Sequence, residues 1–593
     1  KFNINKKIKK SRRNEVVKKA IKKIVGNDDI DKYKYSINAV LDEERRQYTN
    51  TQFQTFDDID IEESIENYLN EYSVGNVSST FDKFYVYVSK NYAPNQGGTD
   101  DKNDCLYNAI FTSYNFDVEL MPNKINKPHK LKKYLELQRN DKVCISKLKE
   151  LEEILNCSFE VSGEAEYISN VLKPKHIKMT LMYGHYKFIQ NNRQNVLSSG
   201  VRYKNVNEAN IYTFTYNDDN VKIFNGEEET IISRNELKEM QNNKDYLLIF
   251  IKAGDLIDER NKYIKKAKYF YEKYGEMINF YKSQYHSQLN YKNILQKLQG
   301  TQKPDEISNH EAYVIDKAFR GGLRFHTKGE FENVYDYDIN TMYAHYLTCG
   351  LFTFPILKPE YQTIKVEDFK TWSCYQYGFY YCKPLNTHKF FEVKNVFSWY
   401  NHFDLQVFKL LNIDFEIKET DNNHLFYSSE KRINGKIFKK YVDELYKIKC
   451  NCPEEYKDDV KLFLSSIYGS MCKKNTNTQY ATFQEPLDIE NNLINSIEPT
   501  EKGAILETID INNIFSTDYA RVSFITAYCR YKMIQILINN VKNFDNIIHL
   551  NTDGFTTKTE IKTLPISSEI GKFKVKKYSK FIIHHLSKID KIV

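Results

Sequence analysis

Two short apolar strands in the C-terminal half of the chain each end in a carboxylate. Alternating apolar and polar positions predict a strand in FENVYDYDINTMYAHYL (331–347), which reaches Asp338 before an aromatic segment. The apolar run in IIHLNTDGFTTK (547–558) predicts a second strand, which reaches Asp553 between Thr552 and Gly554. Acidic residues commonly end strands, so two readings are open: each aspartate is a metal ligand, or it is only the polar end of a strand before a turn.

The hydrophobic pattern changes several times along the chain and predicts an α+β multidomain protein. FDKFYVYVSKNY (81–92) alternates like a strand. Between residues 105 and 195, helical periods in HKLKKYLELQ and ISKLKELEEIL adjoin a strand pattern in HIKMTLMYGHYKFI, which is typical of a small α+β domain. Residues 255–300 are charged and helical, and an aromatic, strand-rich texture begins after about residue 311. The 593 residues allow three or four domains.

These changes set the domain boundaries that we expect. We place a basic and acidic N-terminal extension at 1–80, a small domain at 81–200, a mixed and helical connector at 201–310 and a C-terminal domain at 311–593. The first 25 residues are rich in lysine and arginine, which fits a solvated helix or a segment that binds nucleic acid. The chain begins with Lys1, so we expect its natural N-terminus to lie upstream.

Composition narrows the class of protein. The net charge of +7 permits a polyanionic partner without requiring one. No stretch approaches the roughly 18 apolar residues of a membrane span, and no secretory signal opens the chain, so we expect no membrane partner. The ten cysteines lack the spacing of zinc-binding pairs and fit free thiols in a reducing, intracellular compartment. The nucleus, the cytoplasm and the mitochondrion are not distinguished.

A basic helix is predicted between the two aspartates. YKDDVKLFLSSIYGS (456–470) places Lys457 and Lys461 one turn apart, and Lys449 precedes them beyond Pro453. Two-metal phosphoryl transfer needs a pair of carboxylates that hold two divalent ions, and a triphosphate brings more negative charge than the metals neutralise. A basic helix face beside an acidic pair therefore suits that chemistry.

In order and spacing, these segments resemble the motifs of family B DNA polymerases of the protein-primed branch, used by some bacteriophages, adenoviruses, virus-like transposons and linear plasmids. DINTMY (338–343) is similar to motif A, Asp-x-x-Ser-Leu-Tyr, and KLFLSSIYG (461–469) is similar to motif B, Lys-x3-Asn-Ser-x-Tyr-Gly. NTDG (551–554) resembles motif C, Asp-Thr-Asp-Ser. The intervals leave room for the two insertions typical of this branch, at about 350–448 and 473–517.

The flanking segments extend the resemblance to about 311–593. AFRGGLRF (318–325) matches the Tyr-x-Gly-Gly type of segment that precedes motif A. YARVSFITAYCRYKMIQIL (519–537) looks like the palm helix before motif C, and IGKFKVKK (570–577) resembles the sequence that follows it. The resemblance implies a palm and fingers fold.

The resemblance also implies site residues. Asp338 and Asp553 would be shared ligands of two Mg2+ or Mn2+ ions, with the carbonyl of Ile339 completing one shell. Tyr343 would lie under the deoxyribose of the incoming nucleotide, and Lys461, helped by Lys449, would bind its triphosphate. Ser465 and Tyr468 would contact the nucleotide or the nascent base pair. The residues that would contact DNA are Arg320, Gly321, Gly322, Ser466 and Gly469.

Several departures from the family pattern affect these expectations. Asn551 replaces the first Asp of motif C, which is the less direct metal neighbour, so we expect a weakened but not abolished activity. Ser465 replaces the Asn of motif B and removes an amide. No proofreading exonuclease is expected, because FDVEL (116–120) lacks later partners and IDFEI (413–417) falls after motif A. The chain stops at Val593, about where the thumb should follow, so we expect the thumb to be truncated or absent.

The N-terminal third carries a cysteine and a histidine in a different resemblance. TDDKNDCLYNAIF (99–111) places Cys105 between a turn and a helix, and LMYGHYKFI (181–189) places His185 on a strand. The two segments resemble OTU-type cysteine proteases, although Asn103-Asp104 replaces Gly-Asn and Lys187 stands where an acid or amide would follow His185. Three readings remain: a protease, an inert or partner-binding OTU-like domain with a ubiquitin-like partner, or an unrelated Cys and His in a core.

The leading hypothesis is a DNA-directed DNA polymerase that acts in replication of a mobile or viral genome. Its expected partners are template and primer DNA, dNTPs and a terminal priming protein whose hydroxyl starts the new strand. One alternative is a degenerate polymerase retained as a nucleic-acid-binding protein. The other is an OTU-like protease or deubiquitinase with an inactive polymerase part.

Overall fold

The computed structural model describes most of the chain from residue 103 onward and shorter segments before it. The described residues are 2–3, 13–25, 30, 33–42, 47–48, 56–57, 59–61, 65, 83–90, 96–97, 103–114, 121–163, 165–171, 173, 175–182, 185–188, 207–217, 220–243, 245–251, 254–370, 374–420, 422–482, 492–499, 503–510, 514–585 and 588–592. Within these ranges, no helix has the length and apolar character needed to cross a membrane.

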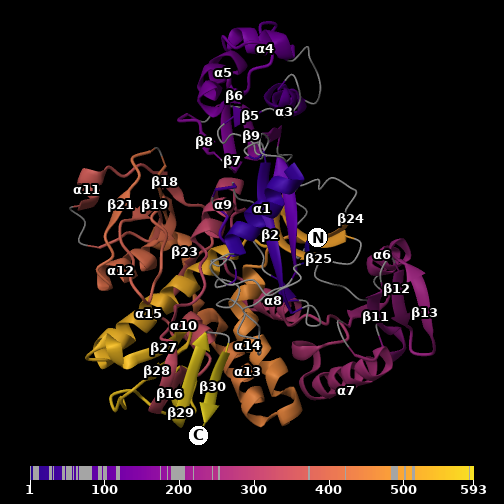
Figure 1. Cartoon of the computed structure of the whole chain (residues 1–593), viewed down its shortest axis with the longest axis vertical. Coiled ribbons are helices and arrows are strands. Elements are labelled where there is room, and N and C mark those ends of the chain that lie inside the picture. Colours follow the sequence, from indigo (N-terminus) through magenta and orange to yellow (C-terminus); the bar gives the residue numbers. More distant parts are fainter. Residues whose placement is uncertain are drawn as a thin grey trace.

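A six-stranded antiparallel sheet forms the base of the C-terminal part (Figure 1). The strand order is β15-β27-β28-β16-β29-β30. β16 therefore lies between β28 and β29, two strands that come much later in the chain. The strands are β15 (Arg324–His326), β16 (Gly329–Ile339), β27 (Ile547–Asn551), β28 (Gly554–Thr557), β29 (Phe573–His585) and β30 (Lys588–Ile592). This arrangement brings the two predicted acidic strands into one sheet.

Helices pack with this sheet in one large hydrophobic core. They are α9 (Asn309–Ala318), α10 (Met342–Thr348), α13 (Lys439–Asn451), α14 (Lys457–Met471) and α15 (Phe524–Asn540). α15 follows η11 (Ala520–Ser523) and is buried on every side over its first two turns, from Phe524 to Arg530, which fits the mostly apolar residues of that stretch. The expected palm helix at 519–537 is therefore a central core helix.

The first insertion lies at the left of Figure 1 and shares the large hydrophobic core through buried side chains such as Tyr380, Trp399 and Leu405. Its larger sheet has the order β18-β22-β19-β20, with β21 also paired to β19, and β17 pairs with β23. The bounds are β17 (Thr353–Pro355), β18 (Glu360–Gln362), α11 (Val366–Lys370), β19 (Gly378–Pro384), β20 (Ser398–Asn401), α12 (His402–Leu410), β21 (Phe415–Ile417), β22 (His424–Phe426), η7 (Ser429–Lys431), β23 (Arg432–Asn434) and η8 (Gly435–Phe438).

The second insertion is a three-stranded antiparallel sheet of order β24-β26-β25. It consists of β24 (Thr476–Thr482), β25 (Asn492–Pro499) and β26 (Gly503–Asp510). The Asn38 side-chain amide donates a 2.7 Å hydrogen bond to the carbonyl of Ile497, so the N-terminal segment contacts this insertion.

The expected connector at 201–310 divides into two structural parts. A small mixed sheet of order β13-β12-β11-β14 and α6 form a core of their own, whereas α7 and α8 join the large core. The elements are η5 (Glu208–Asn210), β11 (Ile211–Asn217), β12 (Asn220–Phe224), β13 (Glu229–Ser233), α6 (Arg234–Asn242), β14 (Leu247–Phe250), α7 (Leu256–Tyr274), η6 (Gly275–Ile278) and α8 (His286–Lys297). Buried Asn290 donates to the carbonyl of Phe463 on α14 at 2.7 Å, so α8 is an integral part of the large core rather than a linker.

The small N-terminal domain has its own hydrophobic core and lies at the top of Figure 1. Its sheet order is β10-β9-β7-β8, with β7 and β9 parallel, and the expected mixture of helix and strand is present. Its elements are β5 (Gln96–Gly97), α3 (Cys105–Ser113), α4 (Pro128–Tyr134), β6 (Val143–Cys144), η4 (Ile145–Lys147), α5 (Leu148–Leu155), β7 (Cys157–Gly163), β8 (Tyr167–Ile168), β9 (Lys175–Met182) and β10 (His185–Phe188). FDVEL (116–120) lies outside the described residues.

The expected boundary at residue 80 needs correction. β4 (Lys83–Lys90) pairs with β2 (Tyr33–Asp42) and β1 (Phe2–Asn3), so it belongs to the N-terminal sheet and not to the following domain. β3 (Gln47–Tyr48) pairs with β2 at its other edge. The strand crosses the boundary because its apolar face completes a core with α1 (Arg13–Val25), whose Val17 is fully buried.

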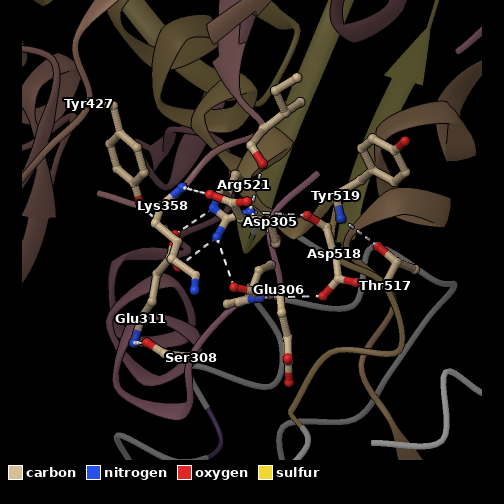
Figure 2. A network of polar contacts seen from close by, with 12 residues as sticks. Asp305, Glu306, Ser308, Glu311, Lys358, Tyr427, Thr517, Asp518, Tyr519 and Arg521 are labelled. Atoms are coloured by element: carbon tan, nitrogen blue, oxygen red, sulfur yellow. Dashed lines mark hydrogen bonds and ion pairs between the residues drawn. The ribbon is translucent and has the colours of Figure 1, made fainter. Parts of the chain in front are cut away.

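A buried ion pair joins the two halves of the C-terminal part (Figure 2). Arg521 in η11 donates to Glu311 on α9 from Nε at 2.5 Å and from Nη2 at 2.7 Å, and both side chains are almost fully buried. The first insertion supplies two further partners: the hydroxyl of Tyr427 donates to Glu311, and the carbonyl of Ile356 accepts from Arg521. Because an isolated buried charge is costly, this network positions α9 against the start of the α15 segment.

Candidate active site

Asp553 lies in the two-residue turn of a β-hairpin. β27 is buried from Ile547 to Leu550, and β28 begins at Gly554. The intervening Thr552-Asp553 turn places the carboxylate at the end of the apolar strand, as the sequence pattern predicts. This position is compatible with both interpretations of Asp553, as a metal ligand or as the polar end of a strand before a turn. The residues around Asp553 have to distinguish the two.

The sheet register brings Asp338 beside Asp553. Asp338 on β16 is opposite Gly554 on β28, and the backbone N–H of Ile339 donates to the carbonyl of Asp553 at 2.8 Å. An added Cβ at Gly554 would lie 2.7 Å from the carbonyl of Tyr337, so the strands approach too closely for a side chain there. The two acids, which are far apart in the sequence, are fixed next to each other by backbone pairing.

Two threonines next to the acids have left-handed backbone conformations. Thr341 has φ +55° and Thr552 has φ +52°, which β-branched residues rarely adopt and which costs about 1–3 kcal/mol each. Gly322 supports the second turn: an added Cβ would lie 2.7 Å from Thr552, whereas one on Gly321 would meet no atom within 4 Å. The expected DNA contact of Gly322 is thus accompanied by a packing role that the sequence did not indicate.

The carboxylate pair is electrostatically unfavourable as it stands. Burial and the neighbouring charge of Asp338 raise the pKa of Asp553 to about 7. Desolvation also raises the pKa of Asp338, although the Lys574 ammonium opposes this shift. Asp336, on the same strand, is already bound: it accepts from Thr556 at 2.7 Å and from Lys591 at 2.9 Å. Uncompensated negative charge is therefore concentrated on Asp338 and Asp553.

Lysines from three elements form a basic group beside the acids: Lys449 and Lys574 act on Asp338, and Lys461 lies next to Lys449. Lys449 on α13 donates to Thr341 Oγ1 at 3.4 Å, and burial together with the positive charges of Lys574 and Lys461 lowers its pKa. Lys461 on α14 is exposed and pairs with Asp458 at 2.6 Å. Lys574 lies on β29, opposite Asp338. The sequence did not single it out, although the alternation of apolar and basic residues in IGKFKVKK (570–577) is a signal that could have identified it. These three cations can neutralise a polyanion.

The two expected tyrosines meet between α10 and α14. The rings of Tyr343 and Tyr468 stack with centroids 4.9 Å apart and an interplanar angle of 30°. Burial raises the pKa of both phenols, so both remain neutral O–H groups at ordinary pH. This contact joins the motif A and motif B segments.

The other expected contact residues differ in accessibility. Ser465 is exposed on α14, and an added Cβ at Gly469 would meet open space. Ser466 instead faces α8, because its hydroxyl accepts a 2.8 Å hydrogen bond from Asn290. Arg320 also needs reinterpretation: its guanidinium lies 3.8 Å from the ring centre of Tyr400 and donates to the Trp399 carbonyl at 2.8 Å. Both side chains are committed to packing, which gives no support to the DNA contacts expected of them.

The donor set at the acidic pair fits a hard divalent cation. Asp338 and Asp553 supply carboxylate oxygens, and Ile339 follows Asp338 on the strand and carries a backbone carbonyl. Burial and the charge of Asp338 raise the pKa of Asp553, so a bound cation would stabilise the ionised pair. Across the part of the chain that the structure describes, no cluster of three or more His, Cys, Asp or Glu side chains could hold a metal. A metal here would therefore depend on two carboxylates and the backbone.

Cys105 and the His185 segment also come together. Cys105 is the first residue of α3, and its Sγ accepts from the backbone N–H of Tyr186 at 3.4 Å. The adjacent Asp104 makes a bidentate ion pair with Arg139 at 2.6 and 2.7 Å. The contact is to the backbone of the residue after His185, so the pairing of Cys105 with the His185 ring stays a prediction, and Asp104 is engaged by Arg139.

Comparisons with known proteins give the family. The model of the family described as DNA polymerase type B, organellar and viral, matches residues 195–546, more than half of the chain. A probable DNA polymerase of Podospora anserina is 22% identical over 315 residues, covering 46% of this chain and 25% of that protein. A probable DNA polymerase of Ascobolus immersus is 28% identical over 293 residues, covering 44% of this chain and 23% of that protein. The chain thus aligns with about a quarter of the length of these curated relatives.

Solved structures of Phi29 DNA polymerase are also similar in part. The complex with single-stranded DNA has a TM-score of 0.41 at 17% identity and covers 65% of this chain and 74% of that chain. The ternary complex with primer-template DNA and incoming nucleotides has a TM-score of 0.42 at 15% identity, with coverage of 63% and 85%. The OTU-like resemblance of the N-terminal domain stays a prediction. The predicted polymerase family is confirmed by the family model. The chain belongs to the organellar and viral family of type B DNA polymerases.

Proposed function

We propose that this chain is a protein-primed DNA-directed DNA polymerase that replicates a mobile or viral genome. The observation that carries the proposal is the pairing of Asp338 with Asp553 beside Lys449 and Lys574, with Lys461 next to Lys449. Two carboxylates with excess negative charge and a surrounding group of cations are the complement of a metal-bound triphosphate.

The residues fit two Mg2+ or Mn2+ ions. Asp338, Asp553 and the carbonyl of Ile339 would hold them, as the oxygen donors of the site allow. When bound, such ions activate the attacking oxygen and stabilise the leaving oxygen of phosphoryl transfer. The protein's own contribution is to keep the two carboxylates in register through the β16–β28 ladder.

The basic and aromatic groups would position the substrates. Lys449 and Lys461 would bind the triphosphate of the dNTP, and Lys574 would add positive charge at the opposite strand. The stacked Tyr343 and Tyr468 would form a flat surface for the sugar and nascent base pair, with Ser465 at the exposed face of α14. The attacking hydroxyl would come from a DNA primer or, at initiation, from a terminal priming protein.

Primer extension tests this proposal. The purified chain is incubated with a primed single-stranded template, dNTPs and Mg2+ or Mn2+, beside an Asp338→Ala control. Extension that disappears in the control is the expected result. No extension with either metal, in a chain that still binds the primed template, would replace the proposal by the degenerate, nucleic-acid-binding alternative.

A second candidate activity is cysteine proteolysis by the N-terminal domain. The contact between Cys105 Sγ and the Tyr186 amide favours it, because it brings a helix N-terminus next to the His185 strand across 81 positions. In this proposal Cys105 is the nucleophile, His185 is its base, and the substrate is a ubiquitin-like protein.

An electrophilic ubiquitin probe tests the second candidate. The full chain is mixed with the probe and examined for a covalent adduct, with Cys105→Ala and Cys144→Ala compared. An adduct lost only in Cys105→Ala supports proteolysis. Equal labelling of both variants, or none in the native chain, argues for an inert or unrelated domain.

A further inference from the structure

A cavity of about 490 Å3 lies where three parts of the molecule meet. Its walls come from the β7–β8 edge and α5 of the N-terminal domain, from α9, and from the first insertion (Figure 1). The lining includes Glu166, Tyr167, His310, Tyr381, Trp399 and Lys418. None of these residues belongs to the candidate active site, and interfaces between domains are frequent places for ligand pockets.

His310 is the most unusual member of this lining. Its side chain is only 2% exposed, yet neither ring nitrogen has a hydrogen-bond partner among the described residues. The nearest carboxylate oxygen, from Glu166, is 3.6 Å from Nδ1, beyond a good hydrogen bond. A buried imidazole normally finds a partner, so a polar ligand group in the cavity would remove this deficit.

Aromatic rings continue from His310 along the cavity. Its ring meets that of Trp399 edge-on at 6.1 Å, and Trp399 stacks on Tyr381 at 5.1 Å with an interplanar angle of 28°. Tyr167 and Tyr313 contribute further half-buried rings. Such a set of rings suits a flat aromatic ligand.

The charge at the opening favours an anion over a cation. Lys149 and Lys418 line the cavity with exposed side chains, and neither forms an ion pair within the described part of the chain. The Lys418 ammonium lies over the Tyr381 ring at 5.0 Å, where a phosphate could draw it away. Glu166 supplies the single opposing charge and, with Asn170 and Asn422, hydrogen-bonding groups that match the edge of a base.

We infer that this cavity binds one unpaired nucleotide, separately from the polymerase site. The base would lie among the rings and satisfy His310, and its phosphate would pair with Lys418 and Lys149. Nucleotide chemistry of this kind could come from a single strand of nucleic acid or from a free mononucleotide. The cavity is large enough for one nucleotide and joins the N-terminal domain to the core, so its occupancy would hold the three parts together.

Fluorescence of Trp399 gives a direct test, because the chain has only two tryptophans. The full chain carries Trp372→Phe, so that only Trp399 emits. Its emission is followed while dTMP, dAMP or oligo(dT) is added. EDTA is present throughout, because it removes the metal on which triphosphate binding at the polymerase site would depend. Saturable quenching is the expected result. Quenching by mononucleotide and oligonucleotide at similar concentrations identifies a free nucleotide as the source, whereas quenching by the oligonucleotide at much lower concentration identifies a strand.

Variants at the opening separate the cavity from the rest of the surface. Tyr381→Ala and Lys418→Ala should each raise the dissociation constant about tenfold, equivalent to about 1.4 kcal/mol. Tyr271→Ala, at an exposed tyrosine on α7, should leave it unchanged. Circular dichroism and melting of each variant verify its fold.

Three outcomes would overturn the inference. The first is that Trp399 fluorescence stays unquenched at millimolar nucleotide. The second is that the Tyr381 and Lys418 variants bind nucleotide with the same affinity as the native chain. The third is that tetramethylammonium quenches Trp399 and nucleotide does not, which would identify a cation site. None of these outcomes depends on catalysis, because an inactive Asp338→Ala chain gives the same readout. Failure here and failure of the polymerase proposal are therefore distinguishable.

Discussion

The carboxylate pair and the Cys105 region differ in how their charges are balanced. Asp338 and Asp553 lie side by side with their pKa values raised, and the nearby Lys449 and Lys574 form no direct ion pair with either acid among the described residues. In the N-terminal domain, Asp104 is fully engaged by Arg139. Protein charges that are left unbalanced indicate a missing ionic ligand, whereas those that pair internally mainly stabilise the fold.

The largest expected effect comes from Asp553→Asn. Loss of one carboxylate should reduce nucleotide incorporation on the order of a thousandfold or more, since metal-based charge stabilisation contributes several kcal/mol. Thermal stability should stay equal or rise, because the repulsion from Asp338 disappears. Primer extension and a melting curve measure the two effects. Asp336→Asn is the matched control, and an equal loss of activity there would remove the special role of the pair.

Gly322→Ala should have the next largest effect. The added Cβ meets Thr552 at 2.7 Å and must displace the turn that carries Asp553. Misplacement by about 1 Å can cost about 100-fold in rate, and overpacking about 1–3 kcal/mol in stability. Gly321→Ala, which meets open space, is the control. Comparable kinetics in the two variants would show that the turn tolerates the shift.

Lys449→Ala should raise the KM for dNTP and lower kcat/KM about tenfold. A charge-assisted hydrogen bond contributes about 1.5–3 kcal/mol, and Lys449 on α13 is more enclosed than the motif B residue Lys461. Steady-state kinetics at varied dNTP concentration measure the change. Lys457→Ala, at the start of α14 and paired with Glu454, should be neutral; a similar defect there would point to a diffuse charge effect.

Asn551→Asp should produce a gain of a few fold. Asn551 ends β27 opposite Gly554, so a carboxylate there would enlarge the acidic donor set. The Mg2+ concentration for half-maximal rate should fall, while the metal-free chain melts slightly lower because a third negative charge is added. An unchanged metal dependence would mean that the site is adapted to asparagine.

Cys105→Ala should have the smallest effect on polymerisation. The N-terminal domain has a separate core, so primer extension should stay within about twofold of the native rate. A large loss would contradict the separation of the two regions and would connect the small N-terminal domain to the polymerase site.

The sequence predicted the elements of the site better than their surroundings. The strands at Asp338 and Asp553 and the helix with Lys461 could be identified because hydrophobic period and motif order are local properties. The orientation of Arg320 could not, since its partners Trp399 and Tyr400 lie in a sheet some 80 positions away. Likewise, the strand at 81–92 was assigned to the wrong domain, because the strand with which it pairs cannot be identified from the local pattern.

The Arg521–Glu311 pair has a consequence for how this protein can change over evolution. Tyr427 and Ile356 of the first insertion complete the hydrogen bonds of that pair. Deleting the insertion would remove the Tyr427 hydroxyl from Glu311 and the Ile356 carbonyl from Arg521, while the carbonyls of Asp305 and Glu306 would still accept from Arg521. Because a buried ion pair is stabilised by its surrounding hydrogen bonds, the insertion is part of the support of this pair and not a removable accessory.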